Sequence, residues 1–247
     1  MDDTKLQEVD ALKQRLDALR PLPPAAVRNL REELVLNWTY HSNAIEGNTL
    51  TLLETKVVLE GITVGGKLMR EHFEAINHRD AIHYVEDVVH EAEPLSEWQI
   101  RNLHRLVLKQ IDDANAGVYR KTNVAIVGAR HVPPDMLLVP ERMAALIRWY
   151  DAESARMHPI LRAARLHLDF VGIHPFIDGN GRTARLLLNL ELIKAGYPAI
   201  VLPVQRRLAY YKALDAAQMD GDTAPFVDLV IDCMREAFAR YWFVLAI

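Results

Sequence analysis

Apolar residues recur at helical spacing along most of the chain, and this periodicity is the feature that most constrains its fold. The spacing of three and four residues is clear in Ile100, Leu103, Leu106, Val107 and Ile111. A repeat of this kind places the apolar side chains on one face of a helix. We predict helices at about 5–19, 25–45, 51–60, 68–91, 184–195, 206–219 and 224–243, and others that begin at Ser96, cover 143–150 and include 161–171. The chain is therefore predicted to be all-α.

One segment departs from the helical pattern. Residues 121–132 are rich in β-branched side chains, contain a glycine turn at Gly128, and end at Pro133-Pro134. These features predict a short β-hairpin. An isolated hairpin is only marginally stable, so we expect it to lean on the helices and to move.

The clearest break in the chain is Pro21-Leu22-Pro23-Pro24. It separates an N-terminal helical arm, residues 1–22, from one domain predicted to cover 23–247. The apolar stripe of the arm is too thin for an independent domain, so we expect it to pack against the rest.

Composition excludes several classes of protein. A formal net charge of −4 argues against a nucleic-acid-binding protein, and the single cysteine, Cys233, excludes an internal disulfide and a multi-cysteine metal site. Apolar runs fall short of the roughly 18 residues that span a bilayer, and the polar, acidic start does not resemble a signal peptide. We expect a cytoplasmic protein with neither nucleic-acid nor membrane partners.

The densest group of reactive side chains is the sequence HPFIDGNGRTAR at 174–185. A glycine-rich turn that opens a helix presents free N–H groups to an anion, and Arg182 and Arg185, three apart, can reach the same anion. Asp178 is an oxygen ligand of the kind that holds Mg²⁺ against phosphates, and His174 can accept a proton near neutral pH. Together they indicate nucleotide chemistry.

The same residues admit simpler interpretations one at a time. Asp178 opens a sequence like that of an EF-hand loop, but the twelfth position is Asn189 instead of glutamate, and arginines replace further oxygen ligands. A lone histidine is usually a packed side chain, and lone arginines are usually solvated. The combination favours a phosphate site over calcium binding.

A second motif lies at Ser42-Asn43-Ala44-Ile45-Glu46-Gly47-Asn48. Ser42 and Glu46 are four residues apart and share a helix face, and Gly47 is suited to end that helix. Taken alone, this pattern is that of an ordinary helix C-terminus with an exposed glutamate.

The string at 174–185 fits in full the signature HPFx(D/E)GNGRxxR, and the chain thereby resembles the Fic family. Fic proteins transfer AMP from ATP to hydroxyl side chains of target proteins, on a helical domain that carries a hairpin called the flap over the active site. The resemblance implies that His174 is the general base and Asp178 the Mg²⁺ ligand. It further implies that phosphates are bound by Gly179, Asn180, Gly181, Arg182 and Arg185.

The segment that ends at Gly47 is similar to the inhibitory helix of Fic proteins, whose pattern is (S/T)xxxE(G/N), and would span about 36–47. By resemblance, Glu46 pairs with Arg185 and occupies the space that the γ-phosphate needs. Residues 44–52, and more loosely 36–235, are similar to metazoan family members that modify an Hsp70 chaperone.

Further roles follow from the resemblance alone. The flap residues Val124, Ala125, Ile126 and Val127 would line the nucleotide and target sites. Tyr210 and Tyr211 would contact the nucleotide, and Gln218 stands in the place of an asparagine that contacts adenine. Related proteins dimerise through a segment that corresponds to about 61–69, which suggests a homodimer.

We therefore predict an autoinhibited protein adenylyltransferase that uses ATP and Mg²⁺, modifies Ser, Thr or Tyr on an unidentified target protein, and modifies itself. One alternative is removal of AMP from a modified protein, with Glu46 orienting the attacking water. Another is a nucleotide-sensing module without catalysis, against which the intact His174 and Asp178 count.

Overall fold

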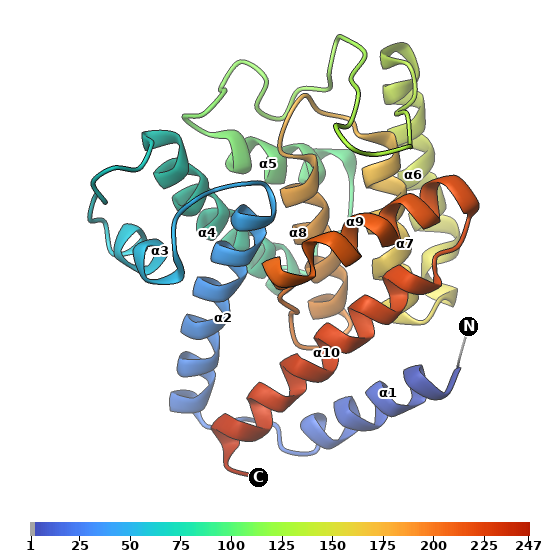
Figure 1. Cartoon of the computed structure of the whole chain (residues 1–247). Helices are drawn as coiled ribbons and strands as arrows, with labels where there is room; N and C mark the ends of the chain where they lie inside the picture. The colour runs from blue at the N-terminus through green and yellow to red at the C-terminus, as the bar shows by residue number, and fades with distance from the viewer. Residues whose placement is uncertain (1–2) are drawn as a thin grey trace.

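The computed structural model describes residues 3–247, and among these residues it has helices but no strand (Figure 1). The all-α prediction is confirmed. The helices are α1 Asp3–Asp17, α2 Pro24–Ile45, α3 Leu52–Leu59, α4 Met69–His90, α5 Glu97–Leu108, α6 Val139–Glu153, α7 Pro159–Ile173, α8 Asn180–Lys194, α9 Arg207–Asp215 and α10 Ala224–Leu245. Three short 3-10 helices lie at Met136–Leu138, Ser154–Arg156 and Val204–Arg206, and a π-helix at Ala216–Asp220 continues α9.

Capping residues explain where several helices begin. The Thr51 hydroxyl accepts a hydrogen bond from the Glu54 N–H at 3.2 Å, and the Glu54 carboxylate accepts one from the Thr51 N–H at 2.7 Å, which forms a capping box at α3. The Ser96 hydroxyl caps α5 in the same position. Helix α8 begins four residues before its predicted start because Gly179 serves as its N-cap, so the glycine-rich turn merges into the first helical turn.

Helices α7 and α8 are consecutive, pack closely against each other and contribute to both main cores of the molecule. Leu166 of α7 and Leu187 of α8 lie in the core with α4, α5 and α6, whereas Leu168 and Leu192 lie in the core with α1, α9 and α10. A helix that is apolar on most sides is stable only when it is surrounded. The six residues between these helices, 174–179, are thereby held in the middle of the fold.

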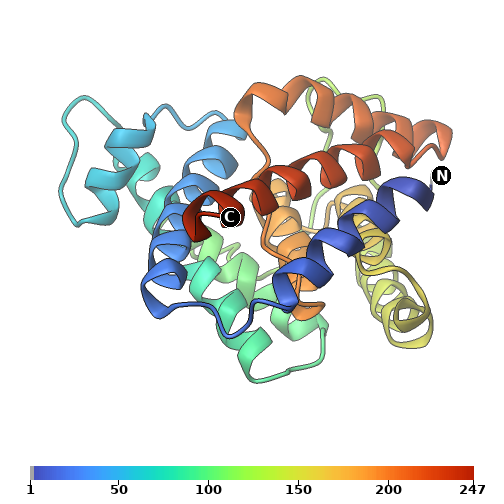
Figure 2. The ribbon, with the colours of Figure 1, turned by 90° about the horizontal axis from the view of Figure 1, so that it is seen from below.

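The N-terminal arm packs along α10, and Figure 2 shows the two helices side by side. Leu6, Val9 and Leu16 of α1 are buried in the second core. Lys5 and Glu8 form ion pairs at 2.8 and 2.6 Å with Asp228 and Arg235 of α10. Apolar contacts and ion pairs both join the N-terminal arm to the rest of the fold. None of the helices within residues 3–247 combines the length and the apolar character needed to cross a membrane.

The predicted β-hairpin at 121–132 is not formed, and this segment is a loop. Of the backbone hydrogen bonds in the described part of the chain, one lies inside the segment, the turn between the Ala129 N–H and the Ile126 carbonyl at 3.2 Å. Val127 is fully exposed, so a strand here has no second layer on which to bury its β-branched side chains. The flap, defined here as residues 121–132, is held by side chains at its ends.

Candidate active site

The loop that joins α7 to α8 is closed by its own side chains. His174 ends α7 in the left-handed conformation, with φ 49° and ψ 58°, which is uncommon for a residue other than glycine. The Asn180 amide bonds the Phe176 N–H at 3.0 Å and the Phe176 carbonyl at 2.9 Å. The Asn180 side chain thus holds the shape of the loop. The backbone N–H of Asn180 is then the group that could bind an anion.

His104 of α5 supports the loop from inside the fold. Its ring stacks on Phe176, with centroids 3.5 Å apart and planes 2° from parallel. Nδ1 accepts the Gly117 N–H at 2.9 Å, so Nε2 carries the hydrogen and donates it to the Asp178 carbonyl at 2.8 Å. Burial lowers the pKa of His104 to about 4, which keeps the ring neutral in this arrangement.

Arg120 connects the loop to the flap. This buried arginine donates from Nε to the His174 carbonyl at 2.9 Å and from Nη1 to the Thr122 carbonyl at 3.0 Å, and its Nη2 bonds the Pro134 carbonyl. Its backbone N–H bonds the Pro175 carbonyl at 2.9 Å. One guanidinium group therefore joins the loop of His174 to Thr122 and Pro134, at the two ends of the 121–132 segment.

The imidazole of His174 is held in its neutral form. Burial lowers its pKa to about 4; the Val171 backbone raises the pKa by less, and the charges of Arg120 and Glu46 act in opposite directions. The ring is therefore neutral at pH 7. A neutral imidazole is the form that a general base requires.

Asp178 is ionised and faces two arginines. Burial raises its pKa, but the charge of Arg182, the Gly179 N–H and Arg70 outweigh burial and hold the pKa below its ordinary value. Its two carboxylate oxygens lie 3.3 Å from Arg182 Nη2 and 2.6 Å from Arg70 Nη2. Mg²⁺ binds to one or two carboxylates and completes its shell with water and phosphate oxygens, so a single ionised Asp178 fits this ion. Among the described residues, no three His, Cys, Asp or Glu side chains gather into a site made of protein ligands alone.

The motif at 42–48 and the second arginine of the 174–185 motif meet in the fold. Arg185 donates from Nε to the Ser42 hydroxyl at 3.0 Å, and from Nη2 to the Ser42 carbonyl at 2.8 Å and to Glu46 Oε1 at 2.7 Å. A Cβ atom added at Gly181 would lie 2.3 Å from Glu46 Oε1, so only glycine admits the carboxylate at this place. Gly47, with φ 100°, follows at the end of α2.

The motif arginines keep unused hydrogen-bond donors in a buried place. Nε and Nη1 of Arg182 and Nη1 of Arg185 are inaccessible and make no hydrogen bond to the described residues, although Arg182 Nη1 lies 3.4 Å from Glu74 Oε1. Native proteins rarely leave such donors without a partner. These donors, on Arg182 in the first turn of α8 and on Arg185 in the second, are of the kind that binds anions in proteins.

Comparison with known proteins places this geometry in a family. Residues 94–192 match the Fic/DOC family. The solved structure of a Fic-1 fragment from C. elegans superposes with a TM-score of 0.90 at 35% sequence identity, over 99% of this chain and 73% of that one. The chain belongs to the Fic/DOC family.

Other relatives agree. A Fic-domain-containing signalling protein from Bacteroides thetaiotaomicron superposes with a TM-score of 0.88 at 28% identity, over 96% of this chain and 97% of that one. The protein adenylyltransferase Fic of Drosophila ananassae is 38% identical over 98% of this chain and 48% of its own length. The chain thus spans about half the length of the curated relatives it matches.

The remaining residues predicted to contact nucleotide differ in their surroundings in this Fic domain. Tyr210 is buried and lies under Arg185, with its hydroxyl 3.1 Å from His167 Nε2. Tyr211 is partly exposed and donates to the Ile45 carbonyl at 3.1 Å. The Gln218 amide bonds the Leu168 carbonyl at 2.7 Å and packs against α7. Of the three, Tyr211 presents an accessible ring.

The flap residues 124–127 lie in the loop between two anchors. Arg120 bonds the Thr122 carbonyl at the start of the flap and the Pro134 carbonyl just after its end, where His131 Nε2 also lies 2.8 Å from the Gly172 carbonyl of α7. Arg130 pairs with Asp215 and Asp220 at 3.4 and 3.3 Å. Val124 and Ile126 are half-buried, and Ala125 and Val127 are exposed.

Four residues of the site were missed in the sequence analysis: Arg70, Glu74, His104 and Arg120. A signal existed for His104, a histidine in the apolar stripe that includes Ile100 and Val107. No local pattern marked the other three, because their partners are far away in the sequence.

Proposed function

We propose that this protein is an autoinhibited protein adenylyltransferase that transfers AMP from ATP to a Ser, Thr or Tyr hydroxyl of a target protein, itself included. One observation carries the proposal. Arg182 and Arg185, on the helix that follows the loop of His174, keep buried donors without a partner among the described residues, and the low pKa of His174 keeps its imidazole neutral. Anion binding and proton removal at one place are the two requirements of this reaction.

The chemistry follows from the residues present. His174 accepts the proton of the target hydroxyl, whose oxygen forms a bond to the α-phosphorus of ATP. The bond from that phosphorus to the bridging oxygen breaks, and pyrophosphate leaves. Arg182, Arg185 and the N-terminal N–H groups of α8 bind the phosphates, and their fixed positive charges stabilise the transition state. Mg²⁺, held by Asp178 when bound, supplies further neutralisation of phosphate charge.

Glu46 supplies the inhibition. Its carboxylate holds Arg185 Nη2 at 2.7 Å, so this donor is not available to a phosphate while Glu46 is in place. A charge-assisted hydrogen bond is worth about 1.5–3 kcal/mol, which corresponds to masking activity by about ten- to a hundredfold. The Drosophila relatives are named protein adenylyltransferase Fic, which supports this type of reaction.

The decisive experiment is mass spectrometry of the Glu46→Gly protein after incubation with ATP and Mg²⁺. We expect an added AMP on the protein, at an initial rate about ten- to a hundredfold above wild type, because Arg185 becomes free. The double variant Glu46→Gly with His174→Ala controls for nonspecific loosening and should gain no AMP.

Other results have distinct meanings. A Glu46→Gly protein no faster than wild type removes the inhibitory role of Glu46 but leaves transfer possible. Loss of AMP from a previously modified protein, in place of gain, favours the reverse reaction. ATP binding with neither gain nor loss identifies a nucleotide sensor.

A homodimer is part of the proposal. Three apolar side chains in the segment 61–69 are exposed, namely Ile62, Leu68 and Met69. Exposed apolar side chains close together are typical of protein interfaces. Sedimentation of wild type against Leu68→Asp measures whether this segment joins two copies.

A further inference from the structure

Arg70 reaches the candidate site from α4, more than a hundred residues before the motif. Its Nη2 donates to Asp178 Oδ2 at 2.6 Å, and its Nε donates to Glu74 Oε1 at 3.1 Å. The side chain of Arg70 is 55% exposed and that of Asp178 43% exposed. The pair therefore lies at the mouth of the site, where a side chain can change its position at low cost.

Glu74 connects Arg70 to the motif. Its Oε1 lies 3.4 Å from Arg182 Nη1, and its Oε2 accepts a hydrogen bond from Asn48, just after the inhibitory helix, at 2.9 Å. Three guanidinium groups thus face three carboxylates, and the formal charges cancel. The residues of this cluster are Arg70, Arg182, Arg185, Glu46, Glu74 and Asp178.

We propose that Arg70 is an exchangeable counter-ion of Asp178, which occupies the carboxylate in the free protein and competes with Mg²⁺ for it. This inference rests on the proposed function, in which Asp178 is the Mg²⁺ ligand. Arg70 is a positioning residue in this role, since it acts through Asp178.

The competition follows from the chemistry of the carboxylate. Asp178 Oδ1 already accepts the Gly179 N–H at 2.6 Å, and Oδ2 accepts Arg70. The carboxylate has further lone pairs for Mg²⁺, so the competition is one of charge: a guanidinium group and a divalent cation at one carboxylate repel each other. Arg70 at Asp178 therefore opposes binding of the ion, and bound Mg²⁺ favours displacement of Arg70.

Arg70 also has an effect when no metal is present. The Asp178 carboxylate repels a polyphosphate, and Arg70 offsets part of this repulsion together with Arg182, whose Nη2 lies 3.3 Å from Asp178 Oδ1. Arg70 thus makes nucleotide binding less dependent on Mg²⁺. Removal of its charge should have two opposite effects, easier metal binding and weaker nucleotide binding without metal.

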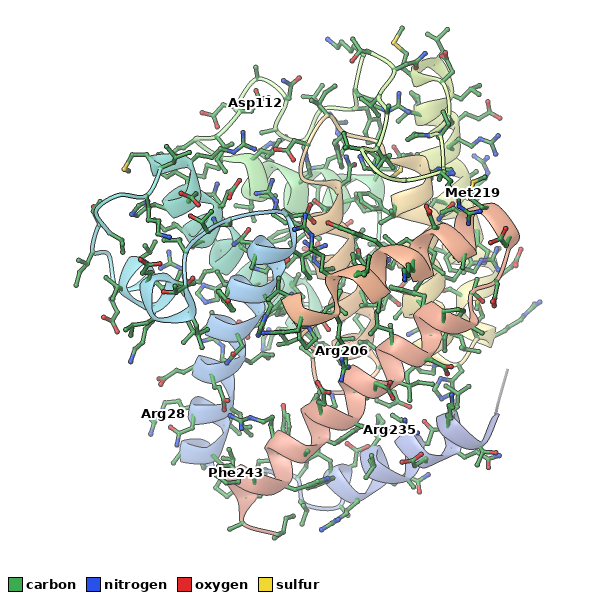
Figure 3. The ribbon with its side chains drawn as sticks, in the orientation of Figure 1. Arg28, Asp112, Arg206, Met219, Arg235 and Phe243 are labelled. Carbon is green, nitrogen blue, oxygen red and sulfur yellow. The ribbon has the colours of Figure 1, made fainter. Side chains whose placement is uncertain are left out.

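The test is calorimetric titration of the full chain with ADP over a series of Mg²⁺ concentrations. In Arg70→Met we expect the half-saturating Mg²⁺ concentration to fall about three- to tenfold and ADP affinity without Mg²⁺ to fall by a similar factor. Arg70→Lys keeps the charge and should lie between Arg70→Met and wild type. The matched control is Arg235→Met on α10, which removes another ion-paired arginine beside α1 (Figure 3).

Each outcome decides the question. Unchanged Mg²⁺ dependence in Arg70→Met, with Mg²⁺-dependent ADP binding in wild type, overturns the role of Arg70 and leaves the proposed function intact. Absence of ADP binding in wild type with Mg²⁺ overturns both. If Mg²⁺ dependence and ADP affinity change equally in Arg70→Met and Arg235→Met, the effect is a general one of net charge, and the inference is also overturned. If Arg70→Met lowers the thermal midpoint, Arg70→Lys against wild type gives the same comparison in a folded protein.

Discussion

At the scale of the residue, burial decides which side chains can react. His174, His104 and His167 all have a pKa lowered by burial, to about 4, about 4 and about 3. His104 uses its nitrogens to hold the loop, and Nε2 of His167 lies 3.1 Å from the Tyr210 hydroxyl. Among these three, His174 is the one placed in the loop between α7 and α8.

Replacement of His174 by alanine should separate binding from transfer. In the Glu46→Gly background we expect the rate of transfer to fall by about 10²–10⁴-fold, because this is the usual contribution of a general base. ADP affinity should change little, since no phosphate group contacts this base in the proposed reaction. Initial labelling rates and calorimetry measure the two quantities, with the exposed His90→Ala as control. Labelling that persists at the rate of the Glu46→Gly parent would remove His174 from its role.

At the scale of the element, the decisive unit is the pair α7–α8 with its loop and the flap. The flap has little internal hydrogen bonding, so its position depends on anchors at its ends. Arg120 is the anchor that also bonds the His174 carbonyl. The position of the flap and the position of His174 are therefore linked through the side chain of Arg120.

Arg120→Met should weaken both functions of this anchor. We expect the free energy of unfolding to fall by about 1–3 kcal/mol, because buried carbonyl groups lose their charged donor. Transfer should fall at least tenfold in the Glu46→Gly background, as His174 loses its fixed position. Urea unfolding and labelling rates check this, with the exposed neighbour Lys121→Met as control. Wild-type transfer in a measurably destabilised Arg120→Met protein would show that the anchor serves stability alone.

At the scale of the whole molecule, two cores meet at α7 and α8, and the buried interior holds histidines from several helices. His78 of α4 is fully buried, and burial, with the charges of Arg185 and Arg182, holds its pKa well below the ordinary value. His104 and His167 are buried in the same neutral state. The packed molecule thus depends on histidines that must stay uncharged.

Stability should therefore fall as the solution becomes acidic. Between about pH 6.5, where these histidines titrate in the unfolded chain, and about pH 4, the unfolded state binds more protons than the folded state. In this range the free energy of unfolding should drop by about 1.4 kcal/mol for each pH unit and each such histidine. Above pH 6.5 the histidines should no longer lower the free energy of unfolding. Urea unfolding at pH 7.5, 6 and 5 measures the slope. His104→Gln should reduce the slope of the free energy of unfolding against pH by the contribution of one histidine. An unchanged slope would contradict the burial of His104 in its neutral form.

The sequence by itself determined the features that depend on neighbours within a few residues. Helix positions followed from spacing at three and four residues, and starts such as Ser96 followed from capping groups nearby in the chain. The motif at 174–185 likewise carries its own turn and helix start. These features are local because backbone hydrogen bonds and caps join residues at most about four apart.

Only the tertiary structure decided which distant groups meet. Arg185 and Glu46 are 139 residues apart, and Arg70 and Asp178 are 108 apart. Arg120 became an anchor because α7 and the flap converge on it, and the flap failed to form strands because no second layer covers it. Such contacts are fixed by how the apolar faces of separate helices pack, and no spacing along the chain records that packing.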